Sequence, residues 1–280
     1  MIEMRSVTFA YGRKQPLFER LDARLEPGTI YGLLGRNGAG KTTMLKLLCG
    51  MLFPQEGEIE VLGWDPAERV PALQQEILFI PEEFPTPPLK VHAYRSLYAP
   101  LYPRFSGEDF ERYLAEFEID AEASLEEMSF GQKKKVLLAF GLAAHTRLLV
   151  LDEPTNALDI PSKGQFRRLL AGAADDDRTI LVSTHQVRDM ENLIDPITIL
   201  EDGQIIFQHS LEEITGRIRM THTAEAPDDA LYAEPAMGGV AAVVPNADGR
   251  DSRIDLEILF NAVTSNPNAI ESHFTKEAAR

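Results

Sequence analysis

Cysteine and positive charge are both scarce in this 280-residue sequence. Cys49 is the single cysteine, which excludes an intrachain disulfide and fits a reducing compartment. The first five residues lack the charged-then-apolar pattern of an export signal, which also predicts a cytosolic protein. Lysine and arginine total 28 against 44 aspartates and glutamates, a formal net charge of −16. No nucleic-acid partner is expected, because binding to phosphates requires clustered cations.

Long hydrophobic runs are missing as well. The longest apolar stretch, residues 136–151, is interrupted by His145, Thr146 and Arg147, whereas a membrane-spanning helix needs about 18 to 20 uninterrupted apolar residues. The chain is therefore not expected to cross a membrane by itself. Its hydrophobic content of 44% and charged content of 26% are those of an ordinary globular protein. The length suits one large α/β domain with an appendage, or two small domains.

The first half of the chain predicts a β-rich start followed by a helical insert. Partial alternation over residues 4–11 and 17–25 indicates two antiparallel strands. A short apolar strand at 29–34 then leads through a glycine loop into a helix at 42–51. Beyond a proline-dense segment, Ser106 begins a capping pattern, and we expect a helical insert over about residues 83–145.

The second half alternates between strand and helix patterns, which predicts a parallel sheet. The expected elements are a strand at 148–151, a helix at 162–171, a strand at 179–183, a helix at 187–194 and a closing hairpin at 197–207. The composition changes after Ser210, and a strand at 240–244 and an amphipathic helix from Leu256 to Val263 are expected beyond it. We therefore predict a domain over residues 1–210 and a small α+β domain over residues 211–280.

A phosphate-binding loop is the clearest motif. It fits G-x-x-x-x-G-K-[ST] and lies between a predicted strand and a predicted helix, as this motif requires. Backbone N–H groups of such a loop converge on phosphate oxygens, Lys41 would bridge the outer phosphates, and the Thr42 hydroxyl would ligate Mg²⁺. The predicted nucleotide-binding residues here are Gly35, Arg36, Asn37, Gly38, Ala39, Gly40, Lys41, Thr42 and Thr43.

Two carboxylates follow the apolar strand at 148–151. Asp152 would hold Mg²⁺ through water, and Glu153 would orient or deprotonate the water that attacks the γ-phosphate. Between the loop and this strand, Ser129 and Gln132 form an S-x-x-Q capping box, a pattern that any helix could use. The lysines at 133–135 that follow it are expected on a solvated helix face, with contact to acidic lipid or phosphate as the alternative.

In this order, the phosphate loop, the Ser-x-Gly-Gln helix start and the Asp-Glu strand resemble the nucleotide-binding subunit of ABC (ATP-binding cassette) transporters, over residues 1 to about 208. The resemblance implies an α/β P-loop NTPase cassette. Such a cassette has a mixed central sheet, an antiparallel β subdomain and a helical insert, and here a small C-terminal α+β extension would be added to it.

The resemblance also implies residue roles. Tyr11 would stack on adenine, with core packing as its alternative. Ser129, Gly131 and Gln132 would cover the γ-phosphate of ATP bound to a second subunit, although Phe130 replaces the family's usual glycine. Asp159 would lie in the loop that communicates between subunits, and His185 would be the switch histidine that hydrogen-bonds the γ-phosphate.

Some positions leave alternatives open. Glu82 stands where the family usually has a glutamine that binds Mg²⁺ and water, and the neighbouring Glu83 is an alternative for that role. Trp64 and the aromatic residues of the insert fit either a groove for a partner helix or ordinary packing. The aromatic residues of the insert are Tyr94, Tyr98, Tyr102 and Phe105. Cys49 is expected to be a buried small apolar residue.

The leading hypothesis is an ATPase subunit that binds ATP and Mg²⁺, forms a homodimer and drives a separate integral membrane permease, in the manner of an exporter. Its expected location is the cytoplasmic face of the cell membrane, as a peripheral protein. The alternative is a soluble ABC-type ATPase that acts on ribosomes or DNA; the sequence lacks both the second cassette and the long heptad repeat of such proteins. A P-loop kinase or GTPase would give no reason for the Ser129 helix start or for His185.

Overall fold

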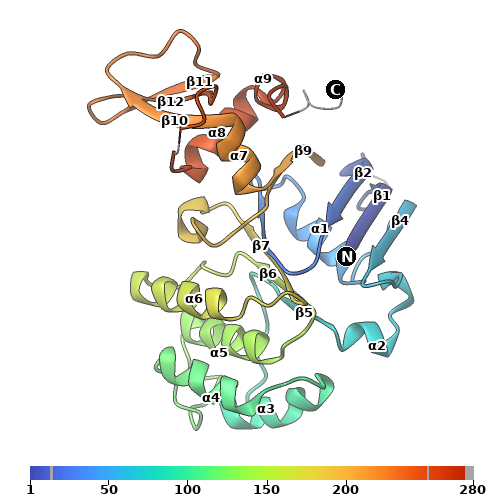
Figure 1. Ribbon diagram of the computed structural model, residues 1–280. Coiled ribbons are helices and arrows are strands. Elements are labelled where there is room, and N and C mark those ends of the chain that lie inside the picture. Colours follow the sequence, from blue (N-terminus) through green and yellow to red (C-terminus); the bar gives the residue numbers. More distant parts are fainter. Residues whose placement is uncertain (13–14, 251, 275–280) are drawn as a thin grey trace.

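The computed structural model describes residues 1–12, 15–250 and 252–274, and its centre is a six-stranded mixed sheet of order β5-β6-β7-β3-β8-β9 (Figure 1). All neighbouring strands are parallel except the β8–β9 pair, which forms the predicted hairpin. Every residue of β3, β6 and β7 is buried, as expected for parallel strands covered on both faces. The strands are β3 (Ile30–Leu34), β5 (Ile77–Ile80), β6 (Leu148–Asp152), β7 (Thr179–Thr184), β8 (Ile197–Glu201) and β9 (Gln204–His209).

An antiparallel sheet of order β2-β1-β4 forms the start of the chain, from strands β1 (Ile2–Phe9), β2 (Phe18–Leu25) and β4 (Glu56–Val61). Its alternating buried residues share an apolar cluster with helix α1 (Lys41–Leu48) and with one face of the central sheet. Two short turns of helix, η1 (Pro66–Glu68) and α2 (Pro71–Gln74), lead from β4 to β5. The predicted antiparallel start of the cassette is thereby confirmed.

The helices between β5 and β7 lie together below the central sheet in Figure 1. They are α3 (Val91–Tyr98), η2 (Ala99–Leu101), α4 (Gly107–Glu116), α5 (Phe130–Ala143) and α6 (Ile160–Gly172). Within this group, Tyr94, Tyr102 and Phe105 surround the buried ring of Phe140, with ring centroids 4.9 to 5.9 Å apart. The aromatic residues of the insert therefore pack internally. Trp64 lies apart from them, on a bridge to Val61 at the end of β4.

The C-terminal elements form a unit with its own sheet, at the opposite end of Figure 1 from α3 and α4. The sheet has the order β10-β12-β11, and helix α8 contributes Leu259 and Val263 to the apolar cluster that also contains residues of the central domain. The unit is made of α7 (Leu211–Arg217), β10 (Ile218–Thr223), β11 (Tyr232–Ala236), β12 (Gly239–Pro245), α8 (Leu256–Ser265) and α9 (Pro267–Glu271).

One predicted helix is wrong. The apolar spacing over residues 187–194 predicts a helix, but the chain forms only the single turn η3 (Val187–Met190). Asn192 then adopts a left-handed backbone (φ 67°), which a continuing helix cannot accommodate. Val187, Met190 and Ile194 are nevertheless buried, so the pattern identified the inward side of the segment but not its backbone. Across the described residues, no helix combines the length and the apolar character needed to span a membrane.

Candidate nucleotide-binding site

Three loops meet at one edge of the central sheet. Strands β6, β7 and β3 are neighbours and parallel, so their carboxyl ends lie side by side. The glycine loop before α1 follows β3, the Asp152–Glu153 pair ends β6, and His185 follows β7. The carboxyl edge of such a sheet is where α/β proteins bind ligands. The topology therefore brings together the phosphate loop, both acidic residues and the histidine predicted from the sequence.

The phosphate loop ends at the beginning of α1. Gly40 takes φ 109°, and a Cβ on it would lie 2.7 Å from the Phe18 ring, so glycine is required there on two counts. Gly40 is also the N-cap of α1 and supplies no side chain to the first N–H groups of the helix. Those donors, together with the positive end of the helix, suit a phosphate.

Lys41 is nearly buried and already has partners. Its Nζ donates to the carbonyls of Gly35 at 2.7 Å and Arg36 at 3.3 Å, and lies 3.6 Å from Oε1 of Glu153. A lysine held over its own loop in this way is placed to exchange those carbonyls for phosphate oxygens.

Asp152 and Thr42 form a pair of oxygen donors. The Thr42 hydroxyl donates to Oδ2 of Asp152 at 2.8 Å, and the Ser183 hydroxyl donates to Oδ1 at 2.5 Å. Hard oxygen donors fit Mg²⁺, which usually keeps waters and takes phosphate oxygens as further ligands. The described residues contain no cluster of three or more His, Cys, Asp or Glu side chains able to hold a metal. The pair thus fits a Mg²⁺ that is completed by nucleotide and water.

Glu153 is buried against His185. Its Oε1 lies 2.8 Å from Nδ1 of His185, and its Oε2 accepts from the His185 N–H at 3.3 Å. The backbone of Glu153 is left-handed (φ 45°), a conformation that costs energy in a non-glycine residue and often marks a functional position. The carboxylate is thereby fixed between an imidazole and the Lys41 ammonium.

A cavity of ≈ 440 Å³ opens beside the phosphate loop. Tyr11 lines it together with Lys41, Thr42 and Thr43, and its hydroxyl is 2.9 Å from the Thr43 hydroxyl. Its ring is half-exposed and packs edge-on against Phe9, so one face is accessible to a planar base. Among the described residues, none from 129–132 lines this cavity.

The predicted signature residues begin helix α5, away from that cavity. Ser129 and Gln132 make both halves of the capping box, which is thus confirmed. A Cβ on Gly131 would lie 2.6 Å from the carbonyl of Ala157, which belongs to the loop between β6 and α6. Glycine at this position therefore allows α5 to begin directly against that loop. Asp159, at the end of the loop, caps α6 by accepting from the Ser162 N–H at 2.9 Å, and hydrogen bonding to Ser162 lowers the pKa of its carboxyl.

A chain of hydrogen bonds joins three of the loops. Glu82 accepts from the Asn156 side-chain amide at 2.6 Å, and Gln186 donates to the other end of the same amide at 3.0 Å. Lys163 donates to Gln186 at 3.1 Å and to Asp189 at 2.6 Å. Glu82, predicted as a metal ligand, is thereby connected to the segment that follows His185.

Lys134 contradicts the expectation of a solvated lysine run. It is fully buried, and its Nζ donates to the carbonyls of Pro81 at 2.9 Å, Glu82 at 3.4 Å and Asp152 at 3.5 Å. Desolvation lowers the pKa of its ammonium to about 8. Sequence reasoning missed this residue, although its spacing of four from the buried Leu138 was a usable signal.

Phe130, at the first position of α5, stacks on Phe84. The ring centroids are 5.0 Å apart and the planes are inclined by 17°, while Nζ of Lys134 lies 5.5 Å from the Phe84 centroid. The residue that replaces the usual glycine of the signature therefore contacts the loop that contains Glu82.

The comparisons with known proteins place the chain in a family. The ABC transporter family model matches residues 18–156. The ABC transporter ATP-binding protein YtrB of Bacillus subtilis (strain 168) is 32% identical over 76% of this chain and 73% of its own. The Nod factor export ATP-binding protein I of Rhizobium meliloti (strain 1021) is 34% identical over 73% of this chain and 63% of its own.

A solved structure shares the fold: a dimeric ATP-binding cassette bound to ADP and Pi in a post-hydrolysis state. It is superposed with a TM-score of 0.66 over 75% of this chain and 99% of its own, at 23% identity. The expected cassette fold is thereby confirmed. The chain belongs to the ABC transporter family as an ATP-binding subunit, an ATPase whose hydrolysis of ATP is coupled to transport.

Proposed function

We propose that two copies of this chain bind two Mg-ATP between them and drive export through a separate membrane permease. The observation that carries the proposal is the division of the predicted site within one chain. Lys41, Glu153 and His185 lie together, whereas the Ser129–Gln132 turn lies outside the cavity around Lys41. The site would be completed by the Ser129 turn of a second copy, and the dimeric cassette among the solved structures supports this arrangement.

Each residue would then have one role. The N–H groups at the start of α1 and the Lys41 ammonium bind the outer phosphates, and Tyr11 supports the base. Glu153 accepts a proton from the attacking water, and His185 holds that carboxylate and contacts the γ-phosphate. Thr42 and Asp152 would hold Mg²⁺, with Glu82 as a further candidate; the ion supplies charge neutralisation to the phosphates.

The membrane partner follows from the family and from the relatives. YtrB is an ABC transporter protein, and the Rhizobium relative is an export protein by name, so we assign this chain to the cytoplasmic face of a membrane, beside an exporting permease. Substrate selection would belong to that permease.

Glu153→Gln tests the shared site. We expect it to keep ATP binding, to lower hydrolysis by ~100-fold or more because the proton acceptor is lost, and to accumulate as a dimer in Mg-ATP. Light scattering after size exclusion and phosphate release report the two effects. The matched control is Glu58→Gln, at an exposed position of β4, which should behave like the unaltered chain.

Two results would contradict the proposal. A monomeric Glu153→Gln protein at saturating Mg-ATP would exclude the shared site. Purification of the same variant from gently solubilised cells in Mg-ATP should bring a multi-spanning membrane protein with it. Recovery of ribosomes or DNA-associated proteins in its place would exclude the transport partner.

A further inference from the structure

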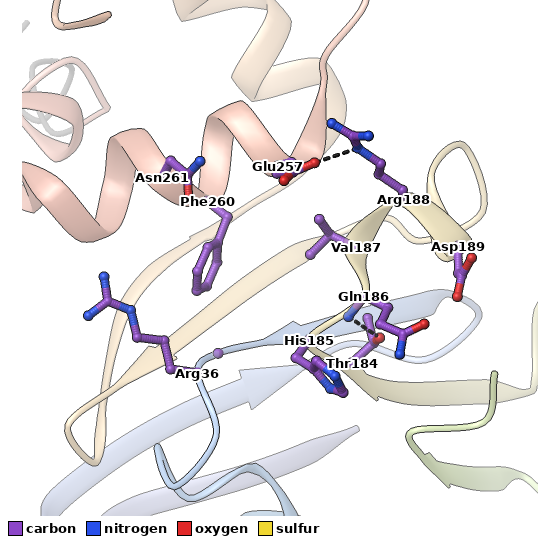
Figure 2. Close-up of a pocket in the computed structure, with 11 residues that line it drawn as sticks. Arg36, Thr184, His185, Gln186, Val187, Arg188, Asp189, Glu257, Phe260 and Asn261 are labelled. Carbon is purple, nitrogen blue, oxygen red and sulfur yellow. Dashed lines mark hydrogen bonds and ion pairs between the residues drawn. The ribbon is translucent and has the colours of Figure 1, made fainter. Parts of the chain in front are cut away.

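The segment after His185 lies between the nucleotide site and the C-terminal unit. Figure 2 shows residues 184–189 passing below helix α8, with the Phe260 side chain directed into the space between Arg36 and His185. Val187 and Met190 of this segment are buried in the same apolar cluster as Leu259 and Val263 of α8. The segment that carries the histidine is therefore packed against the C-terminal unit.

Two ion pairs join the segment after His185 to the C-terminal unit, and the cation and the anion are on opposite sides in the two pairs. Arg188 of the segment pairs with Glu257 in the first turn of α8 (Figure 2), and Glu191 pairs with Arg253, just before α8, at 3.2 Å. Each side thus supplies one cation and one anion. This pattern favours one register of α8 over the segment, because a shift would bring like charges together.

The C-terminal unit has its own attachment to the central sheet. Phe274 stacks on His209 of β9 at 4.2 Å between ring centroids, and His209 Nε2 lies 3.2 Å from Glu271. The Leu211 N–H donates to Asp195 at 2.8 Å. These contacts do not involve residues 185–191, so the C-terminal unit is attached to the central domain independently of that segment.

On its phosphate-loop side the segment borders open space. A cavity of ≈ 510 Å³ lies between Gly35 and Arg36 on one side and His185, Phe260 and Asn261 on the others. The segment therefore has room to move toward the phosphate loop. The segment is held by the contacts of His185 with Glu153, by the Gln186–Asn156 hydrogen bond and by the buried side chains of Val187 and Met190. Lys163 of α6, which binds Gln186 and Asp189, and the two ion pairs to the C-terminal unit add to these supports.

We propose that Glu257 and Arg253 of the C-terminal unit are positioning residues for hydrolysis, acting through Arg188 and Glu191 to hold His185 beside Glu153. This rests on the proposed role of His185. Neither residue lines the cavity beside Lys41, and Glu257 borders the cavity of ≈ 510 Å³ together with His185, Gly35 and Arg36. We therefore expect them to act through His185, with a larger effect on the catalytic step than on nucleotide affinity. The C-terminal unit thereby contributes to ATP turnover in the chain that carries it.

A charge exchange tests the proposal on the purified full-length chain. We expect Arg188→Glu to lower kcat for ATP by ~5-fold and to leave KM within about twofold. An exposed ion pair shifts an equilibrium by up to about fivefold, which sets this upper value. Glu257→Arg should do the same, and the double exchange should restore kcat to within about twofold of the unaltered chain. Arg250→Glu, which breaks the Arg250–Asp248 pair elsewhere in the C-terminal unit, is the matched control and should leave kcat unchanged.

Several outcomes would overturn the proposal. Single variants with unaltered kcat, or a double variant no better than the singles, would show that the ion pairs do not position His185. If a single variant does not fold by circular dichroism, Glu257→Gln replaces it, with a smaller decrease in kcat expected and an unaltered kcat counting against the proposal. His185→Ala distinguishes the role of His185 from that of the C-terminal unit. Full activity of His185→Ala would refute the role of His185 itself. An inactive His185→Ala protein together with a fully active Arg188→Glu protein would refute only the role of the C-terminal unit.

Discussion

We expect the stability of this chain, measured against a Lys134→Met variant, to rise with pH. Lys134 is fully buried, and its amine donates to the carbonyls of Pro81, Glu82 and Asp152. At neutral pH the hydrogen bonds of the charged amine and its desolvation penalty oppose each other, so the two proteins can be similarly stable there. The dependence of their difference on pH is the informative quantity, because titrating groups remote from Lys134 contribute equally to both proteins and cancel.

The sign and the size of this dependence follow from the pKa of Lys134. Burial lowers that pKa from 10.5 to about 8. Between these values the unfolded chain binds more protons than the folded chain, so the free energy of unfolding rises with pH in this window. From about pH 7 to about pH 9.5 the rise amounts to about 2 kcal/mol, at about 1.4 kcal/mol for each unit above the folded pKa.

Urea denaturation of both proteins at the two pH values, without nucleotide and with a chelator, measures the difference. The slope of unfolding free energy against urea must agree between the proteins for the comparison to hold. Lys134→Arg is the control: arginine stays protonated throughout, so its difference from Lys134→Met should not change with pH. A Lys134 difference that is equally flat would refute the reasoning and show that water reaches the amine.

Two further predictions concern local packing. Burial raises the pKa of Cys49 to about 12 from 9.0, so its alkylation by iodoacetamide in the folded chain should be ~1000-fold slower than that of a free thiol. Mass spectrometry should show that the rate recovers after urea is added. Rapid labelling without urea would contradict this prediction. Gly203 takes φ 75°, and a Cβ there would lie 1.8 Å from the Leu17 carbonyl, so Gly203→Ala should cost about 3 kcal/mol and lower the melting temperature by several degrees. Gly172→Ala, with open space around the new methyl group, is its control, and equal melting temperatures for the two variants would refute the argument.

The parts of the site that the sequence predicts are those whose chemistry is local. A glycine loop followed by lysine and threonine, and an apolar strand that ends in two carboxylates, each define their own backbone. The parallel pairing of β3, β7 and β6 then brings them together without further information. The capping box at Ser129 is local in the same sense, because both of its hydrogen bonds lie within four residues.

The features that the sequence does not reveal depend on contacts between distant segments. The spacing of Lys134 from Leu138 places it on the apolar side of α5, yet only the fold shows that its amine contacts Pro81 and Asp152. The spacing of Val187 and Met190 specifies burial, but a single helical turn satisfies it as well as a long helix does. The contact of α8 with the segment after His185 also depends on distant segments, because the sequence around His185 gives no indication of it.

The two departures from the family pattern belong to one structural cluster. The family resemblance implies a glutamine at Glu82 or Glu83 and a glycine at Phe130, and all three residues line a single cavity of ≈ 740 Å³ together with Phe84. Phe130 stacks on Phe84, whose ring faces the Lys134 amine, and the negative charge of Glu82 favours the protonated form of that amine. The Glu82 carboxylate thus acts on a buried cation, and the Phe130 ring stacks on the ring that faces this cation. We expect the two positions to be coupled through Phe84 and Lys134, so that Glu82→Gln and Phe130→Gly together cost less stability than the sum of the single changes. Strictly additive changes in urea unfolding would contradict this coupling.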